Sequence, residues 1–144
     1  SAMTKQWNAD RTISVHCKEI HEISPAIYIC ATDGCFGFLS SPMEFEYMLL
    51  STLKEADTPK EWEEKLIAQW LVHFGDDCTM TILPVGFTCF SDLKTFYQNR
   101  LHVLETNYQN SFSDETDVEE RRQLWQKTYR TGYYRFRRED FREE

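Results

Sequence analysis

The stretch Ala26-Ile27-Tyr28-Ile29-Cys30-Ala31 decides the fold class, because it is a short, continuous apolar run rich in β-branched and aromatic residues. Such runs are typical of a strand that is covered on both faces. The run ends on Thr32-Asp33-Gly34, and Asp-Gly is a common turn dipeptide. The sequence therefore predicts a buried core strand with a polar turn at its carboxyl end.

Two further strands are predicted, one on each side of this core strand in the sequence. Residues 13–20 alternate apolar and polar side chains, which is typical of a half-exposed strand. Residues 79–85 are the third candidate, with Pro84 placing the end of that strand at a sheet edge or a bulge.

Helices are predicted between the second and third of these strands. Ser40-Ser41-Pro42 supplies a cap and a first-turn proline for a helix over residues 43 to about 55. Asp57-Thr58-Pro59 repeats the signal for a helix that continues to about Phe74 and is ended by Gly75.

The C-terminal third of the chain is predicted to be helical as well. Two sets of apolar residues have helical spacing: Phe96, Leu101, Leu104 and Tyr108 in the first, and Leu124, Trp125, Tyr129, Tyr133 and Phe136 in the second. The acidic stretch 111–119 between them is expected to be a mobile connection, and the mixed charges of residues 135–144 are typical of a solvated helix end.

The composition limits the class of protein. A chain of 144 residues with 41% hydrophobic side chains has the size and apolar content of one folded domain. A net charge of −8 argues against a general nucleic-acid or anionic membrane surface, and no apolar stretch approaches the length that spans a bilayer. Ser1-Ala2-Met3 is typical of residues left after an expression tag is cleaved, and it is excluded from the reasoning on fold.

The cysteines predict neither a disulfide framework nor a zinc knuckle, since they are odd in number and none forms a C-x-x-C pair. A reducing cytoplasm fits this usage. Cys17 and Cys30 lie in apolar runs and are expected to be small buried hydrophobes.

Two acidic spots could carry chemistry because each lies at a predicted strand end. Asp33 follows the core strand, and Asp76-Asp77 precedes the third strand. Carboxylate oxygens are the ligands that Mg²⁺ and Mn²⁺ prefer. From spacing alone, however, Asp-Gly and Gly-Asp-Asp are ordinary loop sequences, so the interpretation as plain loops stays open.

Both spots resemble motifs of one enzyme family. The stretch Ile27-Tyr28-Ile29-Cys30-Ala31-Thr32-Asp33-Gly34-Cys35-Phe36-Gly37 resembles the apolar strand ending in Thr-Asp-Gly or Ser-Asp-Gly of the metal-dependent serine/threonine phosphatases of the protein phosphatase 2C class. The stretch Asp76-Asp77-Cys78-Thr79-Met80-Thr81-Ile82-Leu83 is similar to the family's closing motif. The order, the spacing and the intervening helices all agree.

The resemblance implies a fold, a cofactor and site residues. The implied fold is an α/β, two-sheet sandwich flanked by helices. The implied cofactor of the complete domain is a pair of Mg²⁺ or Mn²⁺ ions that hold the water attacking phosphorus, and in this chain alone the metal site is expected to be weak or empty. Asp33 and Asp76 match the aspartates that complete the shell of one metal. Asp77 and Gly34 are expected to support these ligands, and Asp77, where many members carry Asn, is also an alternative ligand.

The resemblance also implies that this chain holds only part of the catalytic domain. The family's first half supplies a bridging aspartate in an Asp-Gly-His-Gly type motif and an arginine that grips the substrate phosphate, and neither motif occurs here. We therefore expect residues 4–87 to be the C-terminal half of such a domain. Residues 88–144 are then a helical extension, as seen in some bacterial members.

The expected function is hydrolysis of phosphoserine or phosphothreonine in a protein substrate, with the chain alone inactive and no nucleic-acid or membrane partner. Asp33 and Asp76 should lie roughly 4–6 Å apart if one ion joins them. A half sandwich is also expected to form a homodimer or to pair with the missing half. The rival interpretation is a non-catalytic phosphatase-like or receiver-like scaffold, or another protein-interaction module, whose acidic turns are plain loops.

Three other sites carry less weight. A zinc set of His16, Cys17 and His21 is disfavoured because the first two point to opposite strand faces. Cys35 as a nucleophile lacks any feature that would lower its pKa. The aromatic residues and arginines of 125–138 could stack nucleic-acid bases, but their helical spacing favours core packing.

Overall fold

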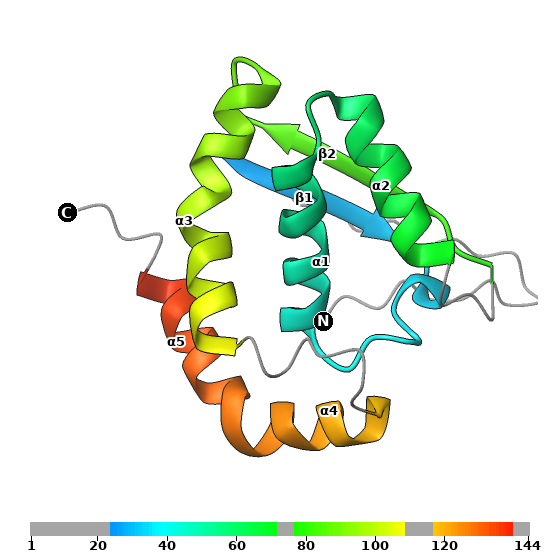
Figure 1. The fold of residues 1–144 in the computed structure, drawn as a ribbon, viewed down its shortest axis with the longest axis vertical. Coiled ribbons are helices and arrows are strands. Elements are labelled where there is room, and N and C mark those ends of the chain that lie inside the picture. Colours follow the sequence, from blue (N-terminus) through cyan, green and yellow to red (C-terminus); the bar gives the residue numbers. More distant parts are fainter. Residues whose placement is uncertain (1–23, 72–76, 109–116, 140–144) are drawn as a thin grey trace, which may run out of the picture.

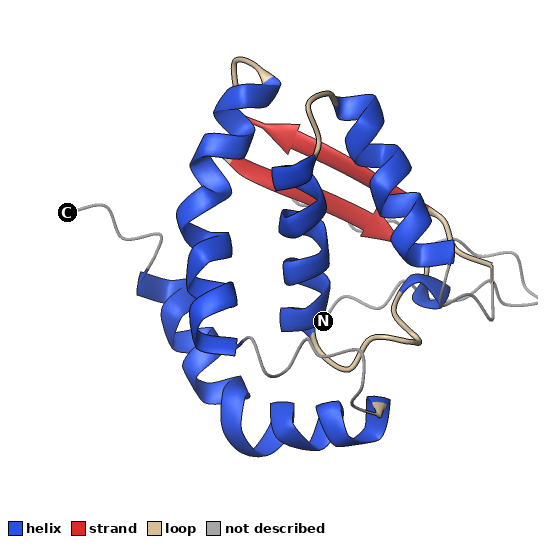
Figure 2. Ribbon diagram, viewed as in Figure 1, coloured by secondary structure: helices blue, strands red, loops and turns tan. Residues whose placement is uncertain are grey.

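A computed structural model describes residues 24–71, 77–108 and 117–139 of the chain. These residues form a mixed α/β fold, in which a small sheet is covered by helices (Figures 1 and 2). In chain order the elements are β1 (Ala26–Ala31), α1 (Pro42–Glu55), α2 (Pro59–Leu71), β2 (Met80–Val85), α3 (Phe90–Tyr108), α4 (Val118–Leu124), a π-helical turn (Trp125–Tyr129) and α5 (Arg130–Glu139). The predicted strand over residues 13–20 lies outside this part of the chain.

The described sheet consists of β1 and β2 paired antiparallel. The register pairs Ala26 with Val85 at one end and Ala31 with Met80 at the other. Because the strands run in opposite directions, the carboxyl end of β1 meets the amino end of β2. The helices lie on one face of this sheet (Figure 1), where Ile29 of β1 is partly buried against the core.

The expectation that the core strand, β1, is covered on both faces is wrong. Tyr28 is 40% exposed and its cross-strand partner Leu83 is 57% exposed. Cys30, expected to be a buried hydrophobe, is exposed on the same face. Successive side chains of a strand alternate between the two sides, and the helices cover only one of them.

The start of α1 confirms its predicted cap. Ser41 is the N-cap, and its hydroxyl accepts the Glu44 N–H at 3.2 Å. The Glu44 carboxylate reaches back to the Ser40 N–H at 2.6 Å. This reciprocal arrangement satisfies donors that a helix start otherwise leaves without partners.

The start of α2 uses the same device, one loop further on. Thr58 Oγ1 accepts the Glu61 N–H at 3.1 Å, and Glu61 accepts the Asp57 N–H at 2.9 Å. The described helix ends at Leu71, so the predicted continuation to Phe74 and the stop at Gly75 lie outside the described residues.

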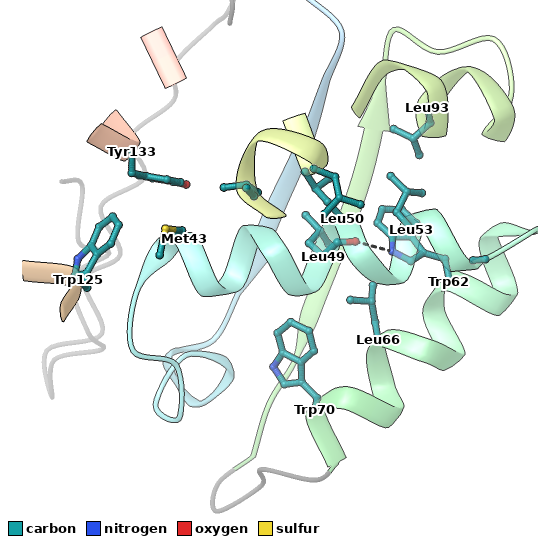
Figure 3. Close-up of a cluster of buried hydrophobic side chains, with 13 residues drawn as sticks. Met43, Leu49, Leu50, Leu53, Trp62, Leu66, Trp70, Leu93, Trp125 and Tyr133 are labelled. Atoms are coloured by element: carbon teal, nitrogen blue, oxygen red, sulfur yellow. Dashed lines mark hydrogen bonds between the residues drawn. The ribbon is translucent and has the colours of Figure 1, made fainter. Parts of the chain in front are cut away.

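One hydrophobic cluster joins the N-terminal and C-terminal helices (Figure 3). Leu53 of α1 is 1% exposed and Leu104 of α3 is fully buried. Trp62 of α2 donates its indole N–H to the Leu49 carbonyl at 3.2 Å, drawn as the dashed line in Figure 3. The α1, α2 and α3 helices therefore share one core, although Phe96 of the predicted α3 stripe is exposed.

An ion pair anchors the C-terminal helices to that core. Arg100 of α3 donates to Glu46 of α1 from Nε at 2.7 Å and from a second nitrogen at 3.0 Å. The Tyr133 hydroxyl of α5 donates to Glu46 Oε2 at 2.6 Å. The Arg100 guanidinium also lies 5.2 Å from the centre of the Tyr133 ring. Three helices thus meet at one carboxylate.

The predicted packing of the C-terminal aromatics is confirmed where the structure describes them. Trp125 and Tyr133 are buried, and their rings lie 5.2 Å apart with an edge-on geometry. Tyr134 is 40% exposed. The predicted connection over residues 111–119 falls largely outside the described residues, and its last residues instead begin α4, with Asp117 as N-cap.

Candidate functional site

The first half of the candidate site is the turn that follows β1. Thr32 is extended, and Asp33–Cys35 forms a single 3-10 turn closed by the Cys35 N–H on the Thr32 carbonyl at 3.1 Å. Asp33 is exposed, and its Oδ1 accepts the Gly34 N–H at 3.1 Å. The turn therefore presents the Asp33 carboxylate to solvent at the end of a strand.

The second half of the site is the segment that leads into β2. Thr79 directly precedes this strand, and the antiparallel register places it beside Thr32. The Thr32 N–H donates to the Thr79 carbonyl at 3.0 Å, and the Thr79 N–H donates to Thr32 Oγ1 at 3.0 Å. Two motifs that are far apart in the sequence thus lie side by side.

A disulfide between Cys35 and Cys78 joins these two segments. The two Cα atoms lie 4.9 Å apart, across a sequence separation of 43 residues. The expectation that the cysteines form no disulfide is therefore wrong for this pair, while Cys30 and Cys89 are free. An odd cysteine count does not prevent one pair from bonding when the fold brings its two members into contact.

A tryptophan of helix α2 holds the backbone of the turn through a hydrogen bond. The Trp70 indole N–H donates to the Cys35 carbonyl at 3.1 Å, and both groups are buried. Phe38 and Phe45 each contact the Trp70 ring edge-on, with centroids 5.9 Å away. A buried donor fixed by two aromatic neighbours holds the backbone of the turn in place.

The sequence-predicted site residues fall into two groups. Asp33, Gly34 and Asp77 are described: Asp33 and Asp77 are exposed, on the two segments that the disulfide joins, and Gly34 is half-buried. Asp76 lies outside the described residues, so its distance from Asp33 stays a prediction. Within the described ranges, no group of three or more His, Cys, Asp or Glu side chains is placed to hold a metal ion.

The donor chemistry fits a hard divalent cation. The exposed side chains at this strand end include the carboxylates of Asp33 and Asp77, while the two cysteines are bonded to each other and offer no thiolate. Mg²⁺ is commonly held by one or two protein carboxylates, with water completing its shell. Asp33 and Asp77 are the carboxylates that the described residues offer at this strand end.

Sequence reasoning missed three contributors to this site: the Thr32–Thr79 pair, the disulfide and Trp70. One signal was available for the disulfide. Each cysteine lies two residues after an aspartate of its motif, Cys35 after Asp33 and Cys78 after Asp76, so any fold that joins the motifs also brings the cysteines together.

A groove lies next to the site, between α2 and β2. We call it the α2–β2 groove; it has a volume of about 810 Å³. Its lining is largely apolar and includes Trp62, Leu66, Trp70, Cys78, Met80 and Ile82. The disulfide therefore borders this groove through Cys78.

Among the described helices, none is long and apolar enough to cross a membrane. Comparison with known proteins returns no family model, no curated protein and no solved structure that matches the chain.

Proposed function

We propose that this chain is part of a metal-dependent serine/threonine protein phosphatase of the protein phosphatase 2C type, and that it contributes carboxylate ligands to one Mg²⁺ or Mn²⁺ ion. The observation that carries the proposal is the contact between the two motif segments. Thr32 and Thr79 exchange backbone and side-chain hydrogen bonds, so the segments that carry Asp33 and Asp77 meet at one end of one sheet, which supports the proposal.

The roles proposed for individual residues follow the motif match. Asp33 and Asp76 act as metal ligands, with Asp77 and the Gly34 N–H supporting them. Gly34 already donates its N–H to Asp33 Oδ1, which orients the carboxylate. In the complete site, a metal pair makes a bound water acidic and neutralises charge on the phosphoryl group that is transferred.

The finer fold proposal is a two-sheet sandwich completed by another part of the domain. Tyr28 and Leu83 face each other across the strands and are both exposed, on the sheet side away from the helices. Large apolar side chains on an exposed sheet face favour packing against a second layer of structure, because that packing removes them from water. We propose that the second sheet of the phosphatase-like domain provides this cover.

The first test is Mn²⁺ binding, followed through the electron paramagnetic resonance signal of free Mn²⁺. Asp33→Asn should raise the Kd at least about 10-fold, because it removes a charged ligand. Asp57→Asn is the matched control, since its side chain is 91% exposed at the start of α2 and lies on a different loop. Equal binding by both variants, or no binding by the unaltered chain, would contradict the proposal.

The second test is hydrolysis of p-nitrophenyl phosphate with Mn²⁺. We expect the 144-residue chain to be inactive, because it lacks the bridging aspartate and the phosphate-binding arginine of the family. The loss of such transition-state contacts typically costs a factor of about 10³ or more. Robust Mn²⁺-dependent hydrolysis by this chain would mean that the chemistry has been placed on the wrong residues.

A non-catalytic interaction module is the second candidate, and the exposed Tyr28–Leu83 face favours it as well. Light scattering combined with the Mn²⁺ titration separates the two, since a homodimer alone fits both. A stable homodimer that binds no Mn²⁺ supports the module, and Mn²⁺ binding that depends on Asp33 supports the phosphatase.

We further propose that the protein acts in the cytoplasm. Disulfides in that compartment are usually transient, catalytic or redox-sensing. The Cys35–Cys78 bridge would then be one that forms and breaks.

A further inference from the structure

The position of the Cys35–Cys78 bridge is the starting observation. It joins the turn after β1 to the segment before β2, directly beside Asp33 on one side and Asp77 on the other. A bond here fixes the distance between the two segments, and Cys78 packs against the edge of the hydrophobic core.

We propose that this bridge is a reversible redox clasp, which holds the two acidic segments together when oxidised and loosens them when reduced by a dithiol. The link to metal affinity rests on the function proposed above. The link to segment mobility rests on the described contacts alone.

Beside the bridge, two hydrogen bonds join the described parts of the segments. Thr32 and Thr79 are both exposed, so water competes for their two hydrogen bonds. Trp70 holds only the Cys35 side, through its carbonyl. Loss of the disulfide therefore removes the covalent link between the segments and leaves these exposed hydrogen bonds to hold Thr79 beside the turn.

Access to the bridge is one-sided. Cys35 is fully buried, whereas Cys78 is half-buried and borders the α2–β2 groove. A thiolate that enters from the groove would attack Cys78 Sγ and form a mixed disulfide, and Cys35 Sγ would leave and take up a proton. The second thiol of the same dithiol then attacks the reductant's own sulfur, which releases Cys78 as a thiol. Two electrons and two protons pass from the dithiol to the bridge, and the dithiol becomes a disulfide.

The reduced cysteines have a reason to stay near each other. Cys35 Sγ lies 3.4 Å from the Thr79 carbonyl oxygen. In the disulfide this sulfur carries no proton, but as a thiol it can donate to that oxygen. This contact keeps Cys35 next to the residue that follows Cys78, which favours reoxidation of the same pair.

The first measurement asks whether the bridge forms and can be reduced. We expect iodoacetamide to alkylate the half-buried Cys78 in the folded chain only after treatment with dithiothreitol, and the fully buried Cys35 only when the reduced chain is then unfolded in urea, as read by peptide mass spectrometry. Cys89→Ser is the matched control, because Cys89 lines the same groove but is free. That variant should behave as the unaltered chain. Alkylation of Cys35 and Cys78 without reductant would overturn the inference.

The second measurement asks what the bridge does. Reduction should raise amide hydrogen exchange at Thr32 and Thr79 by about 10-fold, and should weaken Mn²⁺ binding by a similar factor. The double variant Cys35→Ser/Cys78→Ser should match the reduced chain without reductant. If that variant fails to fold, the comparison of the unaltered chain before and after dithiothreitol stands by itself.

The outcomes separate the clasp from the proposed function. If amide hydrogen exchange rises on reduction and neither the oxidised nor the reduced chain binds Mn²⁺, the redox clasp is supported and the proposed metal site is ruled out. Exchange and Mn²⁺ affinity that both stay unchanged on reduction overturn the clasp and leave the metal site in place.

Discussion

The carboxylate of Glu46 offers the sharpest test of how the helices are held together. It accepts two hydrogen bonds from Arg100, at 2.7 and 3.0 Å, and one from the Tyr133 hydroxyl at 2.6 Å. Arg100 is 8% exposed and the Glu46 side chain 23%. Removal of one partner from a buried ion pair typically costs about 3–5 kcal/mol, because the other charge loses its compensation. With allowance for the part of Glu46 that reaches solvent, we expect Glu46→Ala to lower the free energy of unfolding by about 3 kcal/mol.

Urea denaturation followed by tryptophan fluorescence measures this loss. With a denaturant slope of about 2 kcal/mol per molar, the midpoint should fall by about 1.5 M. Glu105→Ala is the matched control, since Glu105 pairs with Lys54 at 3.2 Å on the surface, where the two side chains are 37% and 60% exposed. That change should cost no more than about 1 kcal/mol. Similar midpoints for the two variants would refute the view that Glu46 joins three helices.

Two further changes test local features. Gly86→Ala should lower the free energy of unfolding by about 1–2 kcal/mol, because Gly86 has a φ of +87° and an added Cβ would lie 2.9 Å from Pro25 Cα. Gly37→Ala is the control, because a Cβ there meets nothing within 4 Å, and it should leave the urea midpoint almost unchanged. Equal losses of stability in the two variants would argue against backbone strain at Gly86. The hydrogen bond from the Asp57 N–H lowers the pKa of Glu61 below its ordinary value of 4.5. The ionised carboxylate therefore stabilises the fold at pH values above 4.5, and this contribution disappears as the pH falls through the lowered pKa. The urea midpoints of the unaltered chain and Glu61→Gln should therefore differ most near pH 7 and converge in acid; a gap that does not change with pH would contradict this.

The sequence predicts local features of the fold well, because they depend on neighbouring residues. Ser41 caps α1 and Thr58 caps α2 through hydroxyl groups that bond to the backbone three residues later. Both signals are complete within one helical turn. The same holds for the strands β1 and β2, whose residues have strong strand preferences.

Features that depend on distant residues could not be predicted in the same way. Nothing near Glu46 in the sequence indicates that Arg100 and Tyr133 will meet it. Burial was also misjudged, since an apolar run such as β1 does not reveal whether one or both of its faces will be covered, and Tyr28 is exposed.

The candidate site lies between these two cases. Its acidic motifs could be found in the sequence, and the contact between Thr32 and Thr79 brings the described parts of their segments together. The joining of Cys35 to Cys78 depends on the antiparallel register, which the sequence does not specify. The role of Asp76 stays a prediction.

The π-helical turn over Trp125–Tyr129 changes the direction in which the side chains of α5 point around the helix axis. Its defining bond runs from the Arg130 N–H to the Trp125 carbonyl, five residues back, so the turn holds one more residue than an α-helical turn would. In a regular α-helix, residues eight apart, as Trp125 and Tyr133 are, differ by about 80° around the axis. The extra residue reduces the effective spacing to seven, which brings the difference to about 20° and explains how both rings reach the same side of the helix, 5.2 Å apart. The segment therefore behaves as a helix that carries a one-residue insertion. A deletion within it would restore the regular winding with both rings still aligned, whereas a second insertion would turn Tyr133 away from Glu46.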